Sequence, residues 1–311
     1  MPKPDLRTRK AYVVTGPTSG IGRASALRLA KYGTIILVGR DRGRLDEVQK
    51  IIAGKRGQSA VSVVCDLSDV VSARRGAAEV AALGLPIAGV LNNAGIRQEV
   101  PTKSAQGWDM SFATNHLGPF VFTETLVPHL ADGTNVLFVC SAVEDPERQP
   151  AARFGFRGAR YISVEACARG EWKPGGSKVA GFDSYATSKQ CNLATVFAFA
   201  REYPRLAFTG IEPGVNLNTG LGRDAGAGAR FVMKYIAPLI VPLVMPFVPW
   251  LRTPKQAARV ITKIVTNPAG PTGIYYDERG HPKQASAQVR DPAFQKRVVD
   301  ETRALLATVP A

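Results

Sequence analysis

The feature of this sequence that most restricts its fold is the alternation of short apolar runs with longer amphipathic stretches. Apolar runs of about five residues are typical of strands buried on both faces of a parallel sheet, and the stretches between them have helical periodicity. The pattern predicts an α/β fold, with a doubly wound parallel sheet in a three-layer α/β/α arrangement. The expected strands are 11–15, 34–38, 61–65, 87–91, 135–139 and 207–211, and the expected helices are 21–32, 42–53, 69–83, 108–130 and 184–203.

The 311 residues contain no internal repeat and no long linker, so we expect a single domain over 1–311 with two irregular segments. The first segment, 143–183, is rich in Gly and Arg and too irregular for a core element. It either lies over the mouth of a site and attracts an anionic substrate, or is a solvated surface loop.

The second irregular segment is 219–252, in which residues 236–251 are apolar but include four prolines. A bilayer-spanning helix needs about twenty apolar residues and does not tolerate so many prolines, which argues against a transmembrane span. We expect a hydrophobic lid over a lipophilic substrate. An oligomer contact or a peripheral membrane contact is the alternative.

The formal net charge of +15 would suit three kinds of binding partner, namely a nucleic acid, an anionic membrane surface and an anionic small molecule. Arg and Lys are scattered along the chain, and it contains neither a zinc-finger pattern nor an RNA-binding aromatic pattern. These observations argue against a nucleic-acid partner. A solvated basic surface is the favoured interpretation of the charge.

The cysteines form no CxxC pair and the histidines show no metal-ligand spacing, so we expect no catalytic metal, no disulfide framework and a reducing compartment. The first ten residues are polar and charged, without the apolar segment of a secretory signal, and we expect a cytoplasmic protein. The residues considered are Cys65, Cys140, Cys167, Cys191, His116, His129 and His281.

A glycine-rich turn follows the first expected strand and opens the first expected helix, with the sequence Thr-Gly-Pro-Thr-Ser-Gly-Ile-Gly over 15–22. Glycines let a backbone turn tightly and approach a pyrophosphate, whose charge is favoured by the N–H groups at a helix N-terminus. In this context the turn predicts a Rossmann-type dinucleotide site rather than a simple tight connection. The candidate cofactor-binding residues are Gly16, Thr18, Ser19, Gly20, Ile21 and Gly22.

The end of the second expected strand indicates which nicotinamide cofactor is bound. Folds of this type discriminate there, and an acidic side chain would accept the adenosine 2′-hydroxyl. This sequence has Arg40, followed closely by Arg42 and Arg44, and a guanidinium pairs well with a 2′-phosphate. We therefore expect NADP(H), with a solvated arginine at a strand end as the alternative.

Two further strand ends carry residues placed to meet the cofactor. Asp66 and Leu67 end the third expected strand, where they would meet the adenine ring. Asn93, Ala94 and Gly95 end the fourth, where small residues permit close approach of the backbone. The asparagine amides at this end could instead tie neighbouring strand ends together.

Tyr185 and Lys189 are four residues apart at the start of the last expected helix, so their side chains share one face. A phenol with a pKa of about 10 is a poor base at neutral pH, but a nearby ammonium stabilises the phenolate and lowers that pKa. Such a tyrosine can exchange a proton with an alcohol or a carbonyl. The pair is common on helix surfaces and gains weight only together with the other motifs.

A set of motifs follows in order along the chain: Thr15 to Gly22, Asn92 to Gly95, Asn115 in Asn-His-Leu-Gly, Ser141 after the fifth strand, Tyr-Ala-Thr-Ser-Lys at 185–189, and Pro213-Gly214. In order and context, these motifs resemble those of the short-chain dehydrogenase/reductase superfamily, over nearly the whole length. The resemblance implies that Tyr185 is the proton donor or acceptor and that Ser141 holds the substrate oxygen. It implies that Lys189 binds the nicotinamide ribose and lowers the pKa of Tyr185.

The same resemblance assigns two further roles. Asn115 would hold a water in the proton relay. The nicotinamide side of the site would be closed by residues after the sixth expected strand, namely Pro213, Gly214, Val215 and Thr219.

Within the superfamily, the sequences at 115–118, 188–192 and 219–221 look most similar to the branch with retinol dehydrogenases and light-dependent protochlorophyllide reductases. Cys140, where a serine is commoner, and Pro17, where a smaller residue is usual, depart from the family pattern without removing a catalytic group. Because many relatives are dimers or tetramers, a homo-oligomer is an option.

The function implied is NADP(H)-dependent hydride transfer between nicotinamide and a carbonyl or alcohol substrate. One alternative is NADPH-dependent reduction of a conjugated carbon–carbon double bond. The other is a non-catalytic NADP sensor, against which the intact set Asn115, Ser141, Tyr185 and Lys189 argues.

Overall fold

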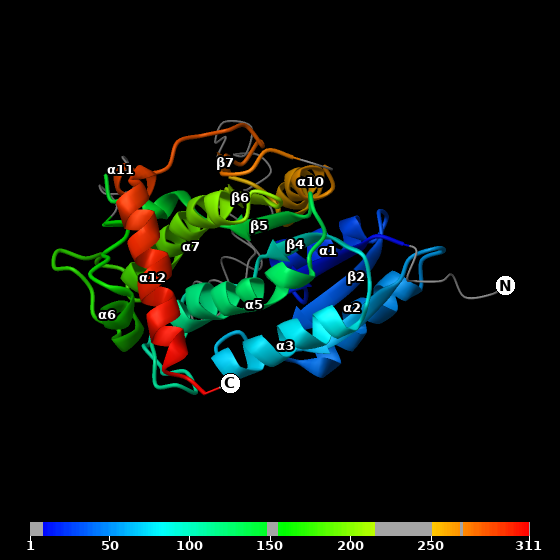
Figure 1. Cartoon of the computed structure of the whole chain (residues 1–311), viewed down its shortest axis with the longest axis horizontal. Coiled ribbons are helices and arrows are strands. Elements are labelled where there is room, and N and C mark those ends of the chain that lie inside the picture. Colours follow the sequence, from blue (N-terminus) through cyan, green and yellow to red (C-terminus); the bar gives the residue numbers. More distant parts are fainter. Residues whose placement is uncertain (1–8, 148–154, 215–250, 268–269, 311) are drawn as a thin grey trace, which may run out of the picture.

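The computed structural model describes residues 9–147, 155–214, 251–267 and 270–310, and these form a seven-stranded sheet flanked by helices (Figure 1). Every neighbouring pair of strands is parallel, in the spatial order β3-β2-β1-β4-β5-β6-β7. The order changes direction between β1 and β4, which is where such sheets open a crevice for a ligand. The strands are β1 (Ala11–Thr15), β2 (Thr34–Gly39), β3 (Ala60–Val64), β4 (Ile87–Asn92), β5 (Asn135–Val139), β6 (Ala207–Ile211) and β7 (Ile274–Tyr276).

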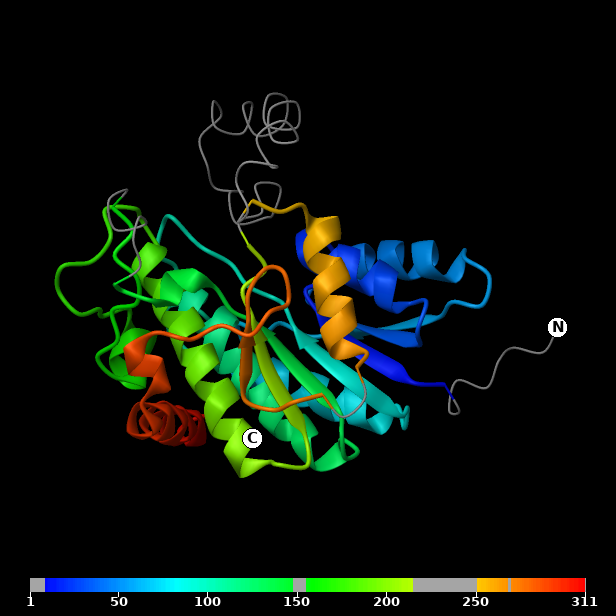
Figure 2. The ribbon, with the colours of Figure 1, turned by 90° about the horizontal axis from the view of Figure 1, so that it is seen from above.

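The helices connect these strands and cover both faces of the sheet (Figure 2). The α-helices are α1 (Gly20–Leu29), α2 (Arg42–Ala53), α3 (Val70–Ala82), α4 (Met110–Phe112), α5 (Gly118–Leu126), α6 (Val164–Arg169), α7 (Phe182–Glu202), α10 (Pro254–Val265), α11 (Ala287–Arg290) and α12 (Pro292–Ala307). The other helical turns are the π-helix η2 (Ala113–Leu117) and the 3-10 turns η3 (Val127–His129) and η4 (Ala142–Glu144).

Successive residues of each strand point to opposite faces, so the sheet has a buried cluster on each side. Val13 and Ile36 belong to the cluster beneath α3, α5, α7 and α12. Tyr12 and Leu37 belong to the other, beneath α1, α2 and α10. Burying a Val, Leu or Ile side chain contributes roughly 1.5–3 kcal/mol. The continuous apolar strand runs thus reflect burial on both faces, and the predicted three-layer α/β/α fold is confirmed.

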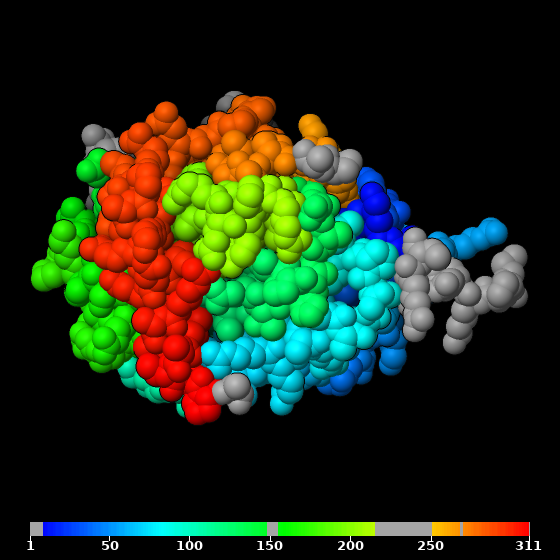
Figure 3. All heavy atoms as spheres, viewed as in Figure 1, coloured from blue at the N-terminus to red at the C-terminus, as the bar shows by residue number. Residues whose placement is uncertain are grey.

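All six expected strands are present with boundaries within about one residue, but one strand was missed. β7 spans only Ile274–Tyr276, too short for a recognisable alternation, and it adds to the edge of the sheet beside β6. The C-terminal helix α12 was also missed. It packs against α7 and α6, and lies on the outer side of the helix layer that contains α7 (Figure 3).

The expected helix at 108–130 is present, but it is not uniform. It begins at Met110, passes through the π-helical turn Ala113–Leu117 and continues as α5 from Gly118. Single π turns inside α-helices are rare and occur frequently at functional sites. This turn contains Asn115, so the irregularity coincides with a predicted catalytic residue.

The prediction that 143–183 is too irregular for a core element is wrong for its described part. Residues 164–169 form α6, and Tyr161, Val164 and Cys167 are buried in the larger of the two clusters. Small residues between arginines hid the short helix from the apolar pattern. The exposed Arg169 forms ion pairs with Glu165 and Glu171 at the surface.

The predicted lid at 219–252 lies outside the described residues except for its last two positions. Across the described ranges, the helices are all too short or too polar to cross a membrane.

Candidate active site

The carboxyl ends of the parallel strands meet at one edge of the sheet, and the glycine-rich turn follows the first of them. Gly16 and Gly20 have φ angles of 64° and 52°, which a tight turn requires and glycine adopts readily. A Cβ added at Gly22 would lie 2.2 Å from the carbonyl oxygen of Gly16 and 2.4 Å from Nδ2 of Asn93. Residues 15–22 therefore form a turn in which backbone segments approach closely at the N-terminus of α1. This turn, called the glycine cradle below, fits a pyrophosphate.

Asn93 ties the ends of β1 and β4 together. Its Nδ2 donates to the carbonyl oxygens of Thr15 and Gly16, at 3.0 and 3.3 Å. The buried hydroxyl of Thr15 accepts from the backbone N–H groups of Asn93 and Ala94, both at 3.0 Å. Asn92 donates to the hydroxyl of Thr123 in α5, at 2.8 Å. The sequence left two roles open for Asn92 and Asn93, contact with the cofactor and tying of neighbouring strand ends. The hydrogen bonds in the structure are of the second kind.

The residues after β2 and β3 lie at the same edge. Arg40 directly follows β2 and is exposed, so its guanidinium is accessible to an anion. Asp66 follows β3, and its Oδ1 accepts from the backbone N–H and the hydroxyl of Ser68, at 2.9 and 2.7 Å. Leu67 is buried, and a Cβ added at Gly118 would lie 1.9 Å from its carbonyl oxygen. The loop after β3 is thereby held against α5.

Three of the predicted catalytic residues come together where β5 ends beside α7. Ser141 follows β5 and its side chain is hydrogen-bonded to the phenol of Tyr185. Nζ of Lys189 donates to the carbonyl oxygen of Val139 at 2.7 Å and lies 5.7 Å from the centre of the Tyr185 ring. Lys189 is only 3% exposed. Residues far apart in the sequence therefore form one polar group, in which Lys189 is buried and Ser141 and Tyr185 are partly exposed.

Burial dominates the ionisation of this group. Desolvation raises the pKa of Tyr185 to about 12, and the hydrogen bond with Ser141 offsets only part of that rise. Desolvation also lowers the pKa of Lys189 to about 8. The expectation that Lys189 brings the pKa of Tyr185 below its usual value is wrong for this structure, because burial of the phenol outweighs the nearby charges. Tyr185 is thus a neutral phenol, a proton donor, at pH 7.

Asn115 is completely buried in the π turn and joins two neighbouring segments. Its side-chain amide exchanges two hydrogen bonds with the backbone of Ile96, both 2.8 Å, and donates to the hydroxyl of Ser188 at 3.1 Å. A Cβ added at Gly95 would lie 3.3 Å from Oδ1 of Asn115 and 3.4 Å from Nζ of Lys189. The loop after β4, the π turn and α7 therefore meet at one point.

The last predicted cofactor residues follow β6. Pro213 is buried and Gly214 has a φ angle of 75°, and both lie at the same edge of the sheet. Val215 and Thr219 lie outside the described residues.

Sequence reasoning missed Arg97, which lies in the loop after β4. Its guanidinium donates to the carbonyl oxygen of Ala180, just before α7, at 3.0 Å. It also pairs with Glu99 at 3.1 Å. Its charge acts to lower the pKa of Tyr185, against the larger effect of burial. The available signal was its position two residues after the Asn-Asn-Ala-Gly motif.

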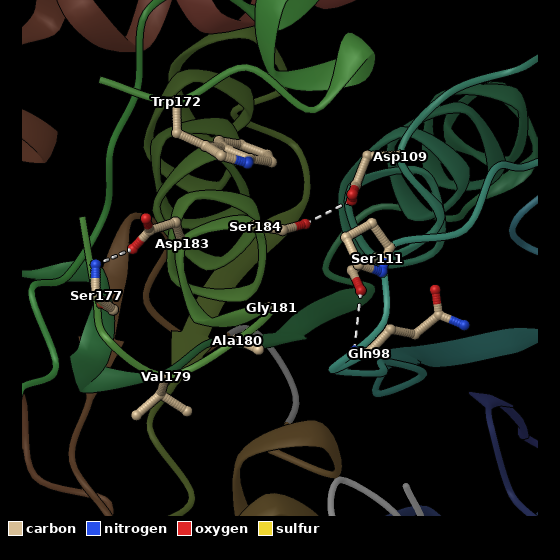
Figure 4. A pocket seen from close by; sticks show the side chains of 11 residues that line it. Gln98, Asp109, Ser111, Trp172, Ser177, Val179, Ala180, Gly181, Asp183 and Ser184 are labelled. Carbon is tan, nitrogen blue, oxygen red and sulfur yellow. Dashed lines mark hydrogen bonds between the residues drawn. The ribbon is translucent and has the colours of Figure 1, made fainter. Parts of the chain in front are cut away.

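A pocket of about 150 Å³ opens beside the N-terminus of α7 (Figure 4). The 143–183 segment contributes Trp172 to its wall, and the hydroxyl of Ser184 donates to Asp109 at 2.5 Å within it. None of the four predicted catalytic residues lines this pocket, so it is separate from the reacting groups.

Over residues 9–147, 155–214, 251–267 and 270–310, no three or more His, Cys, Asp or Glu side chains are grouped so that they could hold a metal ion. The four cysteines all lie within them, and they are buried and free.

A sheet with this strand order, a glycine cradle at its first crossover and a Ser-Tyr-Lys group at its carboxyl edge define the chain as a Rossmann-type oxidoreductase. The family model for short chain dehydrogenases matches residues 10–151. The chain belongs to the short-chain dehydrogenase/reductase superfamily.

Relatives in this superfamily span much of the chain. A protein of Streptomyces sp. (strain C5) named as a daunorubicin C-13 ketoreductase is 28% identical over 87% of this chain and 83% of its own. The uncharacterized oxidoreductase YciK of Escherichia coli (strain K12) is 33% identical over 53% of this chain and 67% of its own.

Protochlorophyllide reductase B of Oryza sativa subsp. japonica is 28% identical over 68% of this chain and 56% of its own length. This similarity confirms the resemblance to the branch that contains such reductases. A short chain dehydrogenase from Burkholderia cenocepacia J2315, solved in complex with NADP, has a TM-score of 0.62 at 20% identity, over 88% of this chain and 96% of that one. It supports the fold.

Proposed function

We propose that this protein is an NADP(H)-dependent carbonyl reductase, or an alcohol dehydrogenase in the reverse direction. The observation that carries the proposal is the convergence of Ser141, Tyr185 and Lys189 at the edge of the sheet that also holds the glycine cradle. A proton donor, a second hydroxyl and a buried cation at one point suit a reaction in which negative charge develops on an oxygen.

Bound NADPH supplies the hydride that reduces the substrate carbon. Tyr185 gives its proton to the substrate oxygen, and Ser141 donates a hydrogen bond to the same oxygen. Because burial raises its pKa to about 12, Tyr185 holds its proton at neutral pH and can donate it to the substrate oxygen. Lys189, held by the carbonyl of Val139, would bind the nicotinamide ribose.

Asn115 would hold a water that returns the proton to Tyr185. Its backbone carbonyl oxygen accepts a hydrogen bond from Nδ2 of Asn192 at 2.7 Å. A carbonyl oxygen has two lone pairs and can accept a second hydrogen bond, which the proposal assigns to the water. The side-chain amide hydrogens are donated to Ile96 and Ser188, and Oδ1 accepts from Ile96, so the side chain holds the surrounding backbone.

NADP(H) is the proposed cofactor because the site has residues suited to both of its phosphate groups, the pyrophosphate and the 2′-phosphate. The cradle at Gly16 and Gly22 suits the pyrophosphate, and the exposed Arg40 suits the 2′-phosphate. The NADP complex of the Burkholderia cenocepacia dehydrogenase is consistent with this choice.

The proposed substrate is a small lipophilic ketone or aldehyde, handled in the cytoplasm. The ketoreductase name of the Streptomyces relative supports the carbonyl group, and the apolar residues 236–251 support lipophilicity. A conjugated carbon–carbon double bond is the second candidate, supported by similarity to protochlorophyllide reductase B. The full set of catalytic residues argues against a sensor without activity.

An NADPH-oxidation screen across aldehydes, ketones and conjugated enones tests the proposal directly. We expect turnover with at least one class of lipophilic carbonyl, and product analysis then separates carbonyl reduction from double-bond reduction. Binding of NADPH without oxidation across all three classes would favour the sensor instead.

A further inference from the structure

A chain of buried polar side chains connects Asn115 with the C-terminal helix α12. Nδ2 of Asn192, on α7, donates to the backbone carbonyl oxygen of Asn115 at 2.7 Å. Oδ1 of Asn192 lies 3.1 Å from Nδ1 of His116. Nε2 of His116 lies 3.0 Å from the hydroxyl of Thr302 on α12. The exposed fraction of these four residues is 3% or less.

The direction of these hydrogen bonds follows from Asn192. Its NH₂ group donates to Asn115, so the atom that faces His116 is its carbonyl oxygen, which can only accept. Nδ1 of His116 therefore carries the ring proton. Nε2 faces the hydroxyl of Thr302, whose single proton can go either to Nε2 or to the carbonyl oxygen of Val298 at 2.6 Å. Burial lowers the pKa of His116 to about 4, so the ring is neutral at ordinary pH.

Aromatic side chains hold the imidazole of His116 in this orientation. The ring centres of Phe112 and Phe120 lie 5.3 and 6.0 Å from that of His116. Phe112 and Phe120 are almost completely buried. The imidazole thus has little freedom to turn away from Asn192 and Thr302.

We propose that His116, Asn192 and Thr302 are positioning residues, through which α12 holds the π turn and the backbone of Asn115 in the active site. The effect on turnover rests on the proposed function, whereas the positioning of the backbone does not. A π turn is less regular than an α-helix and needs support from its surroundings. α12 lies on the outside of the molecule, so the C-terminal helix acts on the site only through its inner face (Figure 3).

Thr302→Val is the central test because it removes the hydroxyl with little change in volume. Its matched control is Thr262→Val in α10. Both threonines are buried, and the hydroxyl oxygen of each lies within hydrogen-bonding distance of the carbonyl oxygen four residues earlier, 2.6 Å from Val298 for Thr302 and 2.7 Å from Ala258 for Thr262. α10 packs on the opposite face of the sheet, so the control reproduces the chemistry without the contact to His116.

We expect Thr302→Val to lower kcat about fivefold, and His116→Phe, which retains a ring, to lower it about thirtyfold, because small misplacements at a reacting centre are costly. The Kd for NADPH should change less than about twofold in both. Thr302→Ser should restore kcat, and Thr262→Val should leave it unchanged.

Amide hydrogen exchange gives a readout that needs no turnover. The backbone N–H of Ile96 donates to Oδ1 of Asn115 at 2.8 Å, so its exchange rate reports how firmly Asn115 is held. We expect faster exchange, by about tenfold, in Thr302→Val but not in Thr262→Val.

Equal kcat and equal Ile96 exchange in Thr302→Val and Thr262→Val would overturn the positioning role, even if Tyr185→Phe still abolishes turnover. If the wild-type protein oxidises no NADPH with any carbonyl, the proposed function fails instead. The exchange comparison then decides the positioning role by itself.

Discussion

The glycine-rich turn after β1 and the polar group around Tyr185 lie at the same edge of the sheet but are built differently. The turn depends on the absence of side chains, since a Cβ at Gly22 would lie 2.2 Å from the carbonyl oxygen of Gly16. The group around Tyr185 depends on side chains from the π turn and α7, on Ser141 just after β5 and on the backbone carbonyl of Val139. The cofactor end is therefore encoded in a short stretch of chain, whereas the chemical end requires the packing of distant elements.

This difference has an experimental consequence. Adding a Cβ to a glycine should disrupt the glycine-rich turn, whereas removing a side-chain oxygen should impair the polar group around Tyr185. Experiments of these two kinds test whether the two ends are truly separable.

The largest effect should come from Tyr185→Phe. Loss of the proton donor should reduce kcat by about a thousandfold while the Kd for NADPH stays within about twofold. Steady-state kinetics and NADPH fluorescence titration measure the two quantities. Tyr12→Phe, a buried tyrosine on the other face of the sheet, is the control. Undiminished turnover would remove Tyr185 from the mechanism.

Gly22→Ala should show the opposite pattern. The added carbon overlaps the backbone of Gly16, which should cost about 2–3 kcal/mol of unfolding free energy and weaken NADPH binding. Gly43→Ala is the matched control, because Gly43 is also helical but its Cβ would make only an ordinary contact of 3.5 Å, with Asp41. Urea unfolding and NADPH titration provide the measurement. Equal stability of the two variants would mean that the turn can relax around a side chain.

Acid should lower the unfolding free energy of the protein through protonation of His116. Its pKa is about 4 in the folded protein and 6.5 when unperturbed, so the unfolded chain binds more protons between these values. The contribution of His116 to stability is complete above pH 6.5 and declines as the pH falls toward 4. Between pH 7 and 4.5, wild type should lose roughly 2 kcal/mol more unfolding free energy than His116→Phe. Parallel urea titrations at the two pH values would show it, and identical losses would contradict the assignment.

Arg40→Ala should have the smallest effect and should be confined to the cofactor end. Removing the guanidinium should weaken NADPH binding about tenfold and leave NADH binding unchanged. Arg56→Ala, an exposed arginine after α2, should change neither. Titration of the three proteins with both cofactors tests this. Equal affinity of the wild type for NADPH and NADH would show that Arg40 does not select the phosphate.

The accuracy of the sequence-based predictions follows the same division. Most of the strands were predictable because they are largely apolar and buried on both faces, whereas β3 is only partly buried. β7 was not, because three residues at the edge of a sheet show no period. The buried residues of the 143–183 segment, such as Tyr161, were missed because α6 spans only six residues, too few for a clear helical period.

The site was also only partly predictable. Ser141, Tyr185 and Lys189 were found from motifs and do lie together. Arg97 was missed because its contact with Ala180 joins segments far apart in the chain. The direction of the Tyr185 pKa shift was wrong, because charges can be read from a sequence but desolvation of a particular oxygen cannot.

By itself, the sequence determined the order of the first six strands and of the helices between most of them, the position of the glycine cradle and the residue types available for chemistry. These are local properties, set by backbone freedom, periodicity and side-chain identity. Only the tertiary structure decided that burial raises the pKa of Tyr185, and that Asn115 is linked through Asn192 and His116 to Thr302. Desolvation and hydrogen-bond partners depend on which distant segments pack together, and no short stretch of sequence contains that information.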